Sequence, residues 1–290
     1  MLSGSPNMLR LFARAGAATI PGVSRLPFLG SGGGGNGLPE LTLVLEGVSA
    51  ERDRLANYDR VCKFPLRDEL PATYPHMLAF PLQLELMTDQ SFPFPALGLV
   101  HIANRIVQHR PIRIGEPLAL RVWAADLTDD PRGRRFSLRS EARVDDALVW
   151  EEDSTILKRD GGSQGGGRRP ARQDQPELPV TATWRLPGDL GRRYASVSGD
   201  MNPIHMHQLS ARLFGFPTAI AHGMWTKARC LAALDPRLPD SFAVEVEFKK
   251  PILLPATVEF AELDDAAGIG FAVRGAGKGT PHLDGRVSFG

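Results

Sequence analysis

Residues 194–205 read Tyr-Ala-Ser-Val-Ser-Gly-Asp-Met-Asn-Pro-Ile-His, and residues 215–224 read Gly-Phe-Pro-Thr-Ala-Ile-Ala-His-Gly-Met. Asp200 and His205 lie five positions apart, on either side of the pair Asn202-Pro203. A proline ring fixes its own backbone and restricts the residue before it, so this turn is stiff. We therefore expect a carboxylate and an imidazole held close together, shortly before an apolar helix that begins at Gly223.

These residues suggest acid–base chemistry on a carbonyl compound. An ionised aspartate raises the pKa of a neighbouring imidazole and orients its ring, and the two groups can hold one water molecule. Gly223, at the start of a helix, has a free N–H and no side chain that blocks access to it. Such backbone donors stabilise an oxyanion on a carbonyl oxygen. Base, water and donor together suit addition of water across a C=C bond conjugated to a carbonyl, or the reverse reaction.

Other interpretations use the same residues. The Asp-x-Asn-Pro turn could be a helix N-cap, with His205 a surface residue. His205, His207 and His222 could be metal ligands, although no cluster of cysteine or glutamate joins them. A nucleophilic Ser198 is disfavoured, because Val-Ser-Gly-Asp is not a Gly-x-Ser-x-Gly elbow. We expect Ser198 and Asn202 to support the turn through bonds to nearby backbone groups.

The composition is that of an ordinary soluble globular protein, with 42% hydrophobic and 23% charged residues in a chain of 290. The 34 basic and 33 acidic side chains nearly cancel, which disfavours nucleic acid or an anionic membrane as the main partner. Cys62 and Cys230 lie far apart without metal-ligand spacing, so we expect reduced thiols in a reducing compartment, the cytoplasm. No apolar run approaches the roughly 20 residues that span a bilayer.

Residues 1–39 differ from the rest of the chain. They contain Arg10, Arg14 and Arg25 but no acidic residue, and their last part is the run Gly-Ser-Gly-Gly-Gly-Gly-Asn-Gly. This composition could belong to a mitochondrial presequence. It is also typical of a small amphipathic segment followed by a flexible linker, and we expect residues 1–39 to form such a flexible extension.

The remaining sequence contains the same plan twice, at 40–160 and at 176–290, with a Gly/Arg-rich linker at 161–175. Tyr58-x-x-Val61-Cys62 aligns with Tyr194-x-x-Val197-Ser198, and Arg110-Pro111-Ile112 aligns with Lys250-Pro251-Ile252. A repeat this long indicates two copies of a domain. In the shared register Phe64 takes the place of Asp200 and Glu69 that of His205. We therefore predict one active site, in the second copy.

Each copy is expected to contain a helix, a central apolar helix and about five strands. Apolar residues nearly encircle the central helix at 223–234, so a mostly antiparallel sheet must wrap around it. The two sheets would join edge to edge, which removes two exposed strand edges. The expected helices are 51–61, 76–87, 188–197 and 223–234. The expected strands are 41–47, with a turn at Gly47, 98–107, 116–126, 135–143, 147–157, 180–186, 242–249, 256–263, 269–274 and 282–289.

The motif Tyr-x-x-x-Ser-Gly-Asp-x-Asn-Pro-x-His, followed seventeen residues later by His-Gly-Met, resembles the signature of the (R)-specific enoyl-CoA hydratases and the wider MaoC-like dehydratases. The two copies resemble the double-hotdog members of that group. The resemblance implies an α+β fold of two tandem hotdog domains, each an antiparallel sheet wrapped around a central helix, that form a pseudo-dimer. Some relatives carry a serine in the central helix where this chain has Cys230 and Leu231, so we transfer no role there.

The resemblance also implies roles. Asp200 and His205 would act on water, Gly223 would donate the oxyanion hydrogen bond, and His222 would support the site beside Ser198 and Asn202. The implied reaction is reversible hydration of a trans-2-enoyl thioester to the (R)-3-hydroxyacyl thioester in fatty-acid metabolism, on acyl-CoA or an acyl carrier protein. No metal or redox cofactor is expected, because CoA or phosphopantetheine is part of the substrate.

We further expect a monomer or a homodimer. In the first copy, the apolar residues that would line or support the acyl-chain pocket, or else form ordinary core, are Leu78, Phe80, Leu82, Leu84 and Leu86. Two alternatives use the same fold. One is a non-catalytic module that binds acyl thioesters, which would not need both Asp200 and His205. The other is a hotdog thioesterase, which would need a carboxylate on the central helix, and residues 223–234 offer none.

Overall fold

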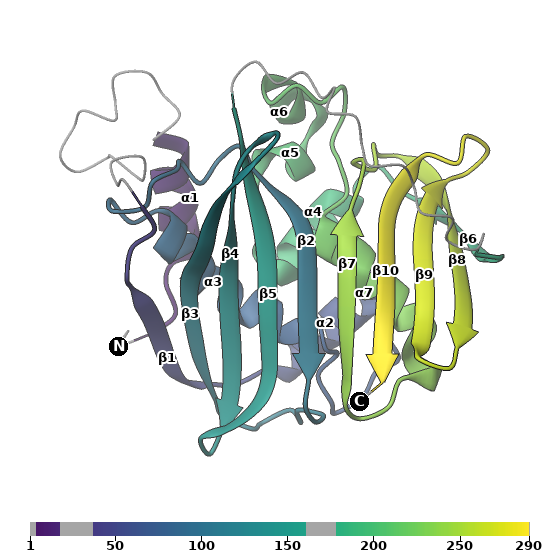
Figure 1. Cartoon of the computed structure of the whole chain (residues 1–290), viewed down its shortest axis with the longest axis horizontal. Coiled ribbons are helices and arrows are strands. Elements are labelled where there is room, and N and C mark those ends of the chain that lie inside the picture. Colours follow the sequence, from purple (N-terminus) through teal and green to yellow (C-terminus); the bar gives the residue numbers. More distant parts are fainter. Residues whose placement is uncertain (1–3, 18–36, 161–177, 290) are drawn as a thin grey trace.

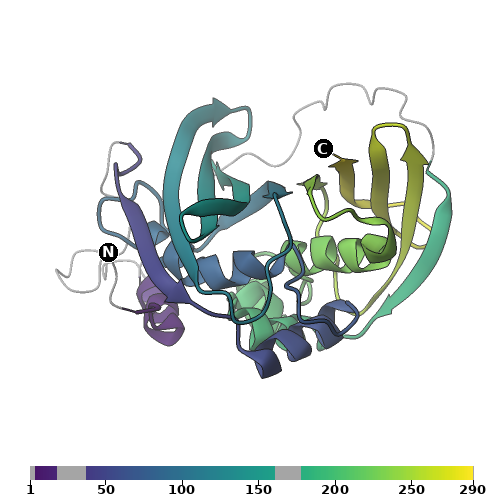
Figure 2. The same cartoon turned by 90° about the horizontal axis from the view of Figure 1, so that it is seen from below.

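The computed structural model describes residues 4–17, 37–160 and 178–289. The linker expected at 161–175 lies outside the described residues, as does most of the Gly-rich run before residue 37. All strands belong to one antiparallel sheet of ten, in the order β1-β3-β4-β5-β2-β7-β10-β9-β8-β6. The sheet arches over the helices, which lie on its concave side (Figures 1 and 2).

The two halves repeat one order of elements, as the sequence predicts. The first half consists of β1 (Thr42–Val48), α2 (Arg52–Cys62), α3 (Tyr74–Met87), β2 (Leu99–Gln108), β3 (Leu118–Asp130), β4 (Gly133–Val144) and β5 (Ala147–Arg159). The second consists of β6 (Val180–Leu186), α4 (Leu190–Ser198), α5 (Pro203–Met206), α6 (Gln208–Leu213), α7 (Gly223–Leu234), β7 (Phe242–Phe248), β8 (Ala256–Asp265), β9 (Gly268–Gly275) and β10 (Pro281–Phe289). The short helices α5 and α6 were not expected, and they occur in the second half alone.

Strands β2 and β7 join the halves edge to edge, as expected. They pair antiparallel from Ala103 opposite Glu247 to Gln108 opposite Phe242. Beneath the junction, α2 and α4 meet, and the rings of Tyr58 and Tyr194 lie 6.2 Å apart. These tyrosines are equivalent in the repeat, so they mark the pseudo-two-fold axis.

The central helix α3 is buried on nearly all its faces, and Pro81 is accommodated inside it. Leu78, Leu82, Leu84 and Leu86 are buried, whereas Phe80 is partly exposed. Successive members of this set lie two positions apart, so on a helix they point to different sides. Leu78, Leu82 and Leu86 share one side of the helix, and the leucines of this set belong to the core. A role of these residues beside the acyl chain stays a prediction.

Two local features differ from the predicted elements. The expected turn at Gly47 is a bulge within β1, where the register with β3 shifts between Leu45 and Val48 and Gly47 has a φ of 69°. The residue-by-residue match between the two halves also ends before Glu69, earlier than the sequence predicts. The isolated bridge between Glu69 and Arg113 in the first half matches the bridge between Ile220 and Leu253 in the second. Glu69 therefore corresponds to Ile220 and not to His205, because the first half has no counterpart of α5 and α6.

Part of the expected N-terminal extension is a packed helix, α1 (Met8–Ala17). Its Leu11 and Ala15 are buried. Arg14 donates a hydrogen bond of 2.8 Å to the carbonyl of Thr88, at the end of α3, and forms an ion pair of 3.2 Å with Glu85. Residues 8–17 therefore form the expected amphipathic segment. Because this segment packs against the rest of the protein, this part of 1–39 is not the flexible extension that we expected. Within the described residues, no helix is long and apolar enough to cross a membrane.

Candidate active site

The carboxylate of Asp200 is oriented by the turn that ends α4. Gly199, the C-cap of that helix, has a φ of 82°, a left-handed conformation that favours glycine. The backbone N–H of Asp200 donates to Ser198 Oγ at 3.2 Å, and Asp200 Oδ1 accepts from the N–H of Asn202 at 3.1 Å. Ser198 and Asn202 thus support the turn in the manner expected. The Asp200 side chain keeps 26% of its surface exposed.

His205 lies in α5, whose first turn the motif itself builds. Asn202 is the N-cap, and its Oδ1 accepts from the N–H of Ile204 at 3.3 Å, while Pro203 occupies the first helical position. His205 is 8% exposed, which excludes the surface residue of the N-cap interpretation. Helix α4 presses against this turn, because a Cβ on Gly191 would lie 2.0 Å from the carbonyl oxygen of His205.

The protonation state of His205 suits a base. Its Nδ1 lies 2.9 Å from the carbonyl oxygen of Ile220, which can only accept, so Nδ1 carries the proton and Nε2 carries a lone pair. Burial lowers the pKa of His205, and the opposing effect of Asp200 is smaller. We expected the carboxylate to raise this pKa. The effect of burial on the pKa outweighs that of the carboxylate, so the imidazole of His205 is neutral near pH 7.

His222 completes the cluster. Its ring stacks on that of His205, with centroids 3.6 Å apart and an interplanar angle of 23°. Its Nε2 donates to the backbone carbonyl of Asp200 at 3.0 Å, and its Nδ1 is buried without a hydrogen-bond partner. Burial, followed by the neighbouring His205, lowers the pKa of His222 to about 3, so this ring is also neutral. His222 therefore ties the start of α7 to the Asp200 turn.

Gly223 is the first residue of α7, as predicted, and its N–H has no partner within the helix. A Cβ there would lie 3.0–3.2 Å from ring atoms of Phe248. The absence of a side chain lets Phe248 pack directly over this helix start. Gly223 thus presents a backbone donor immediately after His222.

The site brings one ligand atom each of Asp200, His205 and His222 within 4.8 Å of one another. These residue types could bind a metal ion, but their geometry does not suit one. The in-plane lone pairs of two nearly parallel, stacked imidazoles do not converge on one ion. His207 does not contribute either, since its Nδ1 accepts from the N–H of Leu209 at the start of α6. A neutral base, a carboxylate and a helix N–H instead suit activation of water beside a polarised carbonyl.

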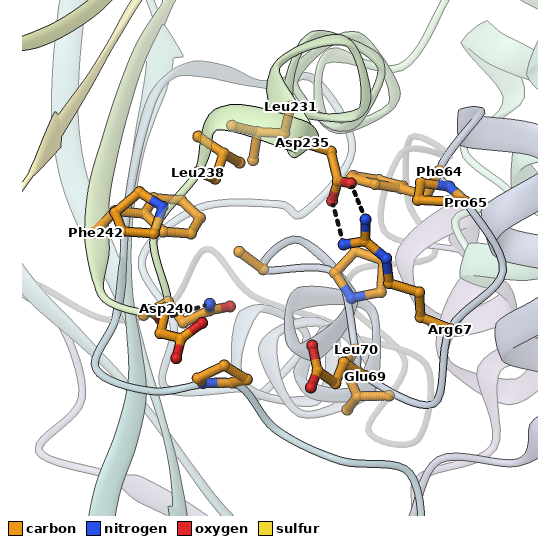
Figure 3. Close-up of a pocket in the computed structure, with 15 residues that line it drawn as sticks. Phe64, Pro65, Arg67, Glu69, Leu70, Leu231, Asp235, Leu238, Asp240 and Phe242 are labelled. Carbon is orange, nitrogen blue, oxygen red and sulfur yellow. Dashed lines mark hydrogen bonds and ion pairs between the residues drawn. The ribbon is translucent and has the colours of Figure 1, made fainter.

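The related place in the first half contains a pocket of about 100 Å³ (Figure 3). Phe64, the counterpart of Asp200, stacks on Tyr58 with an interplanar angle of 13°. Arg67 forms an ion pair with Asp235 at 2.9 Å on the same side of the pocket as Phe64 (Figure 3). No histidine is among its lining residues. The described geometry thus provides the acid–base pair in the second half only.

The sequence did not reveal a buried polar cluster at the junction of the halves. It contains His76, His101, Asn104, Glu152 and Lys227, and its geometry is given below. A signal was present, since Lys227 and His76 are polar residues within the mostly apolar sequences of two buried helices.

Comparison with known proteins agrees with this geometry. A family model, the MaoC like domain, matches residues 169–273. The chain is 36% identical to the 3-hydroxyacyl-thioester dehydratase X of Mycobacterium tuberculosis over 283 residues, which cover 97% of this chain and 98% of the relative. The crystal structure of HtdX from the same organism is 35% identical, covers 85% of this chain and 99% of its own, and superposes with a TM-score of 0.76.

A third protein supports the fold alone. It is an M. tuberculosis protein whose structure is described as a double hotdog fold, 14% identical over 88% of this chain and 98% of its own, with a TM-score of 0.57. The α+β fold of two tandem hotdog domains is therefore confirmed. Extended similarity to a dehydratase over almost the whole chain, together with the motif at 194–224, shows that this protein belongs to the MaoC-like dehydratase family.

Proposed function

We propose that this protein is a hydro-lyase that reversibly hydrates a trans-2-enoyl thioester to the (R)-3-hydroxyacyl thioester in fatty-acid metabolism. The observation that carries the proposal is the buried, neutral His205 beside Asp200, next to the free helix N–H of Gly223. The relative that matches nearly the whole chain is named as a 3-hydroxyacyl-thioester dehydratase, which supports the same chemistry.

In this proposal His205 Nε2 and Asp200 hold one water molecule. His205 accepts a proton as the water oxygen bonds to the β-carbon of the enoyl group. The electrons of the C=C bond move toward the thioester carbonyl, whose oxygen gains negative charge and is stabilised by the N–H of Gly223. A proton then goes to the α-carbon, so that the elements of water are added across the double bond. Dehydration follows the same steps in reverse.

The supporting residues fix this geometry. Ser198 and Asn202 hold the Asp200 turn through the bonds described above. His222 binds the carbonyl of Asp200 and stacks on His205, so it holds the carboxylate turn and the helix start in one arrangement. We assign these three residues positioning roles.

The substrate itself would bring the remaining groups. Base, water and oxyanion donor suffice for the proposed steps, so we propose that no metal or redox cofactor takes part and that CoA or phosphopantetheine enters with the acyl group. An acyl carrier protein is an alternative carrier. The fused halves already form the pseudo-dimer, which allows a monomer or a homodimer. Cys62 and Cys230 are free and buried, which suits a reducing compartment such as the cytoplasm, or the mitochondrion if residues 1–39 are a presequence.

The two alternatives are less well supported. A thioesterase on this fold would use a carboxylate on the central helix, and α7 contains no acidic residue. A binding module would not need a buried base beside a carboxylate. One assay separates the three: with crotonyl-CoA, a hydratase removes enoyl absorbance without releasing thiol, a thioesterase releases thiol, and a binding module does neither. Loss of enoyl absorbance no faster than without protein, for crotonyl-CoA and longer enoyl thioesters, would refute the proposal.

A further inference from the structure

A buried carboxylate lies at the junction of the two halves. Glu152, on β5, is 3% exposed. It accepts hydrogen bonds from His76 Nδ1 at 2.8 Å, Asn104 Nδ2 at 2.7 Å and Gln83 Nε2 at 3.0 Å. The donors come from α3 and β2. Burial acts to raise the pKa of Glu152, but the nearby His76 and the hydrogen bonds from His76 and Asn104 together outweigh it and lower this pKa, so the carboxylate is charged near pH 7.

Lys227 reaches the same cluster from the second half, and burial lowers its pKa to about 7 against the smaller opposing effect of Glu152. It is fully buried on α7, and its Nζ donates to the carbonyl of Val244 at 3.2 Å, to the carbonyl of Asn104 at 3.3 Å and to Asn104 Oδ1. Asn104 therefore bridges the amino group of Lys227 in one half and the carboxylate of Glu152 in the other. Lys227 lies four residues after Gly223, on the same face of α7, so the network is anchored one helical turn from the oxyanion donor.

Such a network is not an efficient means of stabilisation. Apolar residues of similar volume often replace a buried ion pair without loss of stability, because removing two charges from water is costly. The network instead places polar atoms at defined positions in an interior that would otherwise be apolar. One polar atom of this cluster, Nε2 of His101, has no hydrogen-bond partner.

A bulge turns His101 toward this network. In the pairing of β2 with β5, His101 lies opposite Ile156 and Ala103 opposite Thr155, so Ile102 is an extra residue. Side chains alternate along a strand, and without the bulge His101 would face away from Asn104. The extra residue reverses the alternation and directs His101 to the concave face, where Asn104 and Ile156 also point.

The ring of His101 lies between His76, at 6.5 Å, and Phe248, at 4.9 Å. Its Nε2 is buried and has no hydrogen-bond partner. The ring makes a hydrogen bond with the backbone of Ala103, and burial lowers the pKa of His101 to about 3. The imidazole is therefore neutral, and because a backbone carbonyl fixes the proton on the other nitrogen, Nε2 is an unused acceptor.

Phe248 connects this acceptor with the active site. Its ring packs at the edge of His101 and also against Gly223, where a Cβ would lie 3.0 Å from it. One partly exposed aromatic ring thus covers both the oxyanion donor and the unused acceptor.

We propose that His101 is a second substrate-binding group, whose Nε2 accepts a hydrogen bond from an N–H or O–H of the bound acyl thioester when Phe248 moves aside. The inference rests on the proposed function and deepens it. Two parts of a substrate offer such a donor: the amide N–H groups of the pantetheine arm, and a hydroxyl on the acyl chain. The buried network holds the wall behind His101, so that the acceptor keeps its position.

The test compares His101→Phe, which keeps the ring volume and removes the acceptor, with His101→Gln, which retains an acceptor. His109→Phe is the matched control, because His109 follows β2 and its side chain is 39% exposed beside Glu151. Hydration is measured with crotonyl-CoA, with S-ethyl thiocrotonate, which has no amide, and with 2-octenoyl-CoA bearing or lacking a chain hydroxyl. Thermal unfolding confirms that each variant is folded.

If the pantetheine amide is the donor, His101→Phe lowers kcat/KM for the CoA esters about tenfold through KM, and leaves S-ethyl thiocrotonate unchanged. If a chain hydroxyl is the donor, only the hydroxylated octenoyl-CoA loses about tenfold. In both cases His101→Gln recovers part of the loss and His109→Phe behaves as wild type. Equal loss for all substrates, or no loss for any, would overturn the inference.

A binding measurement separates this result from the proposed function. Calorimetry of butyryl-CoA and of a hydroxylated octanoyl-CoA with the wild-type protein needs no turnover. About tenfold weaker binding to His101→Phe supports the acceptor role even if crotonyl-CoA is not hydrated: of both ligands if the pantetheine amide is the donor, and of the hydroxylated ligand alone if the chain hydroxyl is. Unchanged affinity for both ligands, together with normal hydration by the wild type, would refute the role of His101 and leave the proposed function intact.

Discussion

The stacked rings of His205 and His222 lock two segments to each other. His205 Nδ1 binds the carbonyl of Ile220, two residues before His222, and His222 Nε2 binds the carbonyl of Asp200, five residues before His205. Each histidine thus holds the segment that carries the other. Because both protons are taken by carbonyls, both tautomers are fixed, and the lone pair of His205 Nε2 remains for chemistry.

Removal of either acid–base residue should abolish most activity. We expect Asp200→Asn and His205→Ala each to lower kcat for crotonyl-CoA hydration by about 10²–10⁴, because general acid–base catalysis typically contributes that much. The measurement is loss of enoyl absorbance, with circular dichroism to show an intact fold. Glu69→Ala is the control and should keep near wild-type turnover. Near wild-type rates in both site variants would refute the assigned roles.

Gly223→Ala should destabilise the protein through Phe248. The new Cβ would lie 3.0–3.2 Å from three ring atoms, closer than ordinary van der Waals contact, so the ring must move. We expect a loss of about 1–3 kcal/mol in the free energy of unfolding, measured with urea. Adding Phe248→Leu in the same chain should recover part of the loss, since the smaller side chain leaves room. A double variant no more stable than Gly223→Ala would show that the collision is not the cause.

Gly191→Ala should reduce activity without touching the substrate. A Cβ at this position would lie 2.0 Å from the carbonyl oxygen of His205, so α4 and α5 must separate and the base must shift. We expect a lower kcat for crotonyl-CoA together with a lower melting temperature. Gly188→Ala is the matched control, because its Cβ would meet only Pro255, at 3.8 Å. Equal effects of the two substitutions would contradict this account.

Buried histidines should make the protein less stable in mild acid. Burial lowers the pKa of His101 and His222 to about 3 and also lowers that of His205. In the unfolded chain these groups have a pKa near 6.5, so between about pH 6.5 and 3 the unfolded state binds more protons. The contribution of these neutral imidazoles to the free energy of unfolding is therefore complete above about pH 6.5, and it is lost as the pH falls. Urea midpoints should therefore decrease from pH 7 to pH 5, and less steeply in His101→Phe. If the urea midpoint of His101→Phe fell with pH as steeply as that of the wild type, His101 would not be a neutral, buried group in the folded protein.

Lys227→Met should be strongly destabilising although it adds no bulk. The substitution leaves Asn104 Oδ1 and the carbonyl of Val244 without the donor that Lys227 provides, and a buried acceptor left without its hydrogen bond costs about 1–3 kcal/mol. Urea unfolding measures the loss. Lys278→Met, at an exposed turn, should change the free energy of unfolding by less than about 0.5 kcal/mol. A loss below about 1 kcal/mol for Lys227→Met would mean that the hydrogen bonds of Lys227 do not stabilise the fold.

The elements that local patterns control could be predicted from the sequence. Helix α7 has the expected bounds, since apolar residues on all its faces and the glycine at its start are visible in the sequence. Strand β6 was also predicted, as was the edge-to-edge junction of the two sheets, although not which strands form it. The turn between Asp200 and His205 could be anticipated because proline and asparagine act on their neighbours.

The remaining features depend on contacts between distant segments. No residue pattern within β2 indicates the bulge at Ile102. The bulge is visible only in the pairing of β2 with β5, where it turns His101 toward Asn104. The lowered pKa of His205 arises from burial, which a motif does not reveal. Glu69 was misaligned because an insertion as short as α5 and α6 shifts a register without changing the order of elements. Lys227 and Glu152 lie 75 positions apart in the chain and approach only in the folded molecule.

The junction of β2 with β7 has an evolutionary consequence. In a dimer of identical chains every substitution occurs twice, so a change that suits ligand binding in one site also alters catalysis in the other. Here the two halves belong to one chain, and each position can change alone. The first half could therefore lose its acid–base pair and gain His76, His101 and Glu152, while the second half kept its reactive residues. Linkage of the two copies in one gene permits this division of labour, and it fixes one reactive centre to each chain.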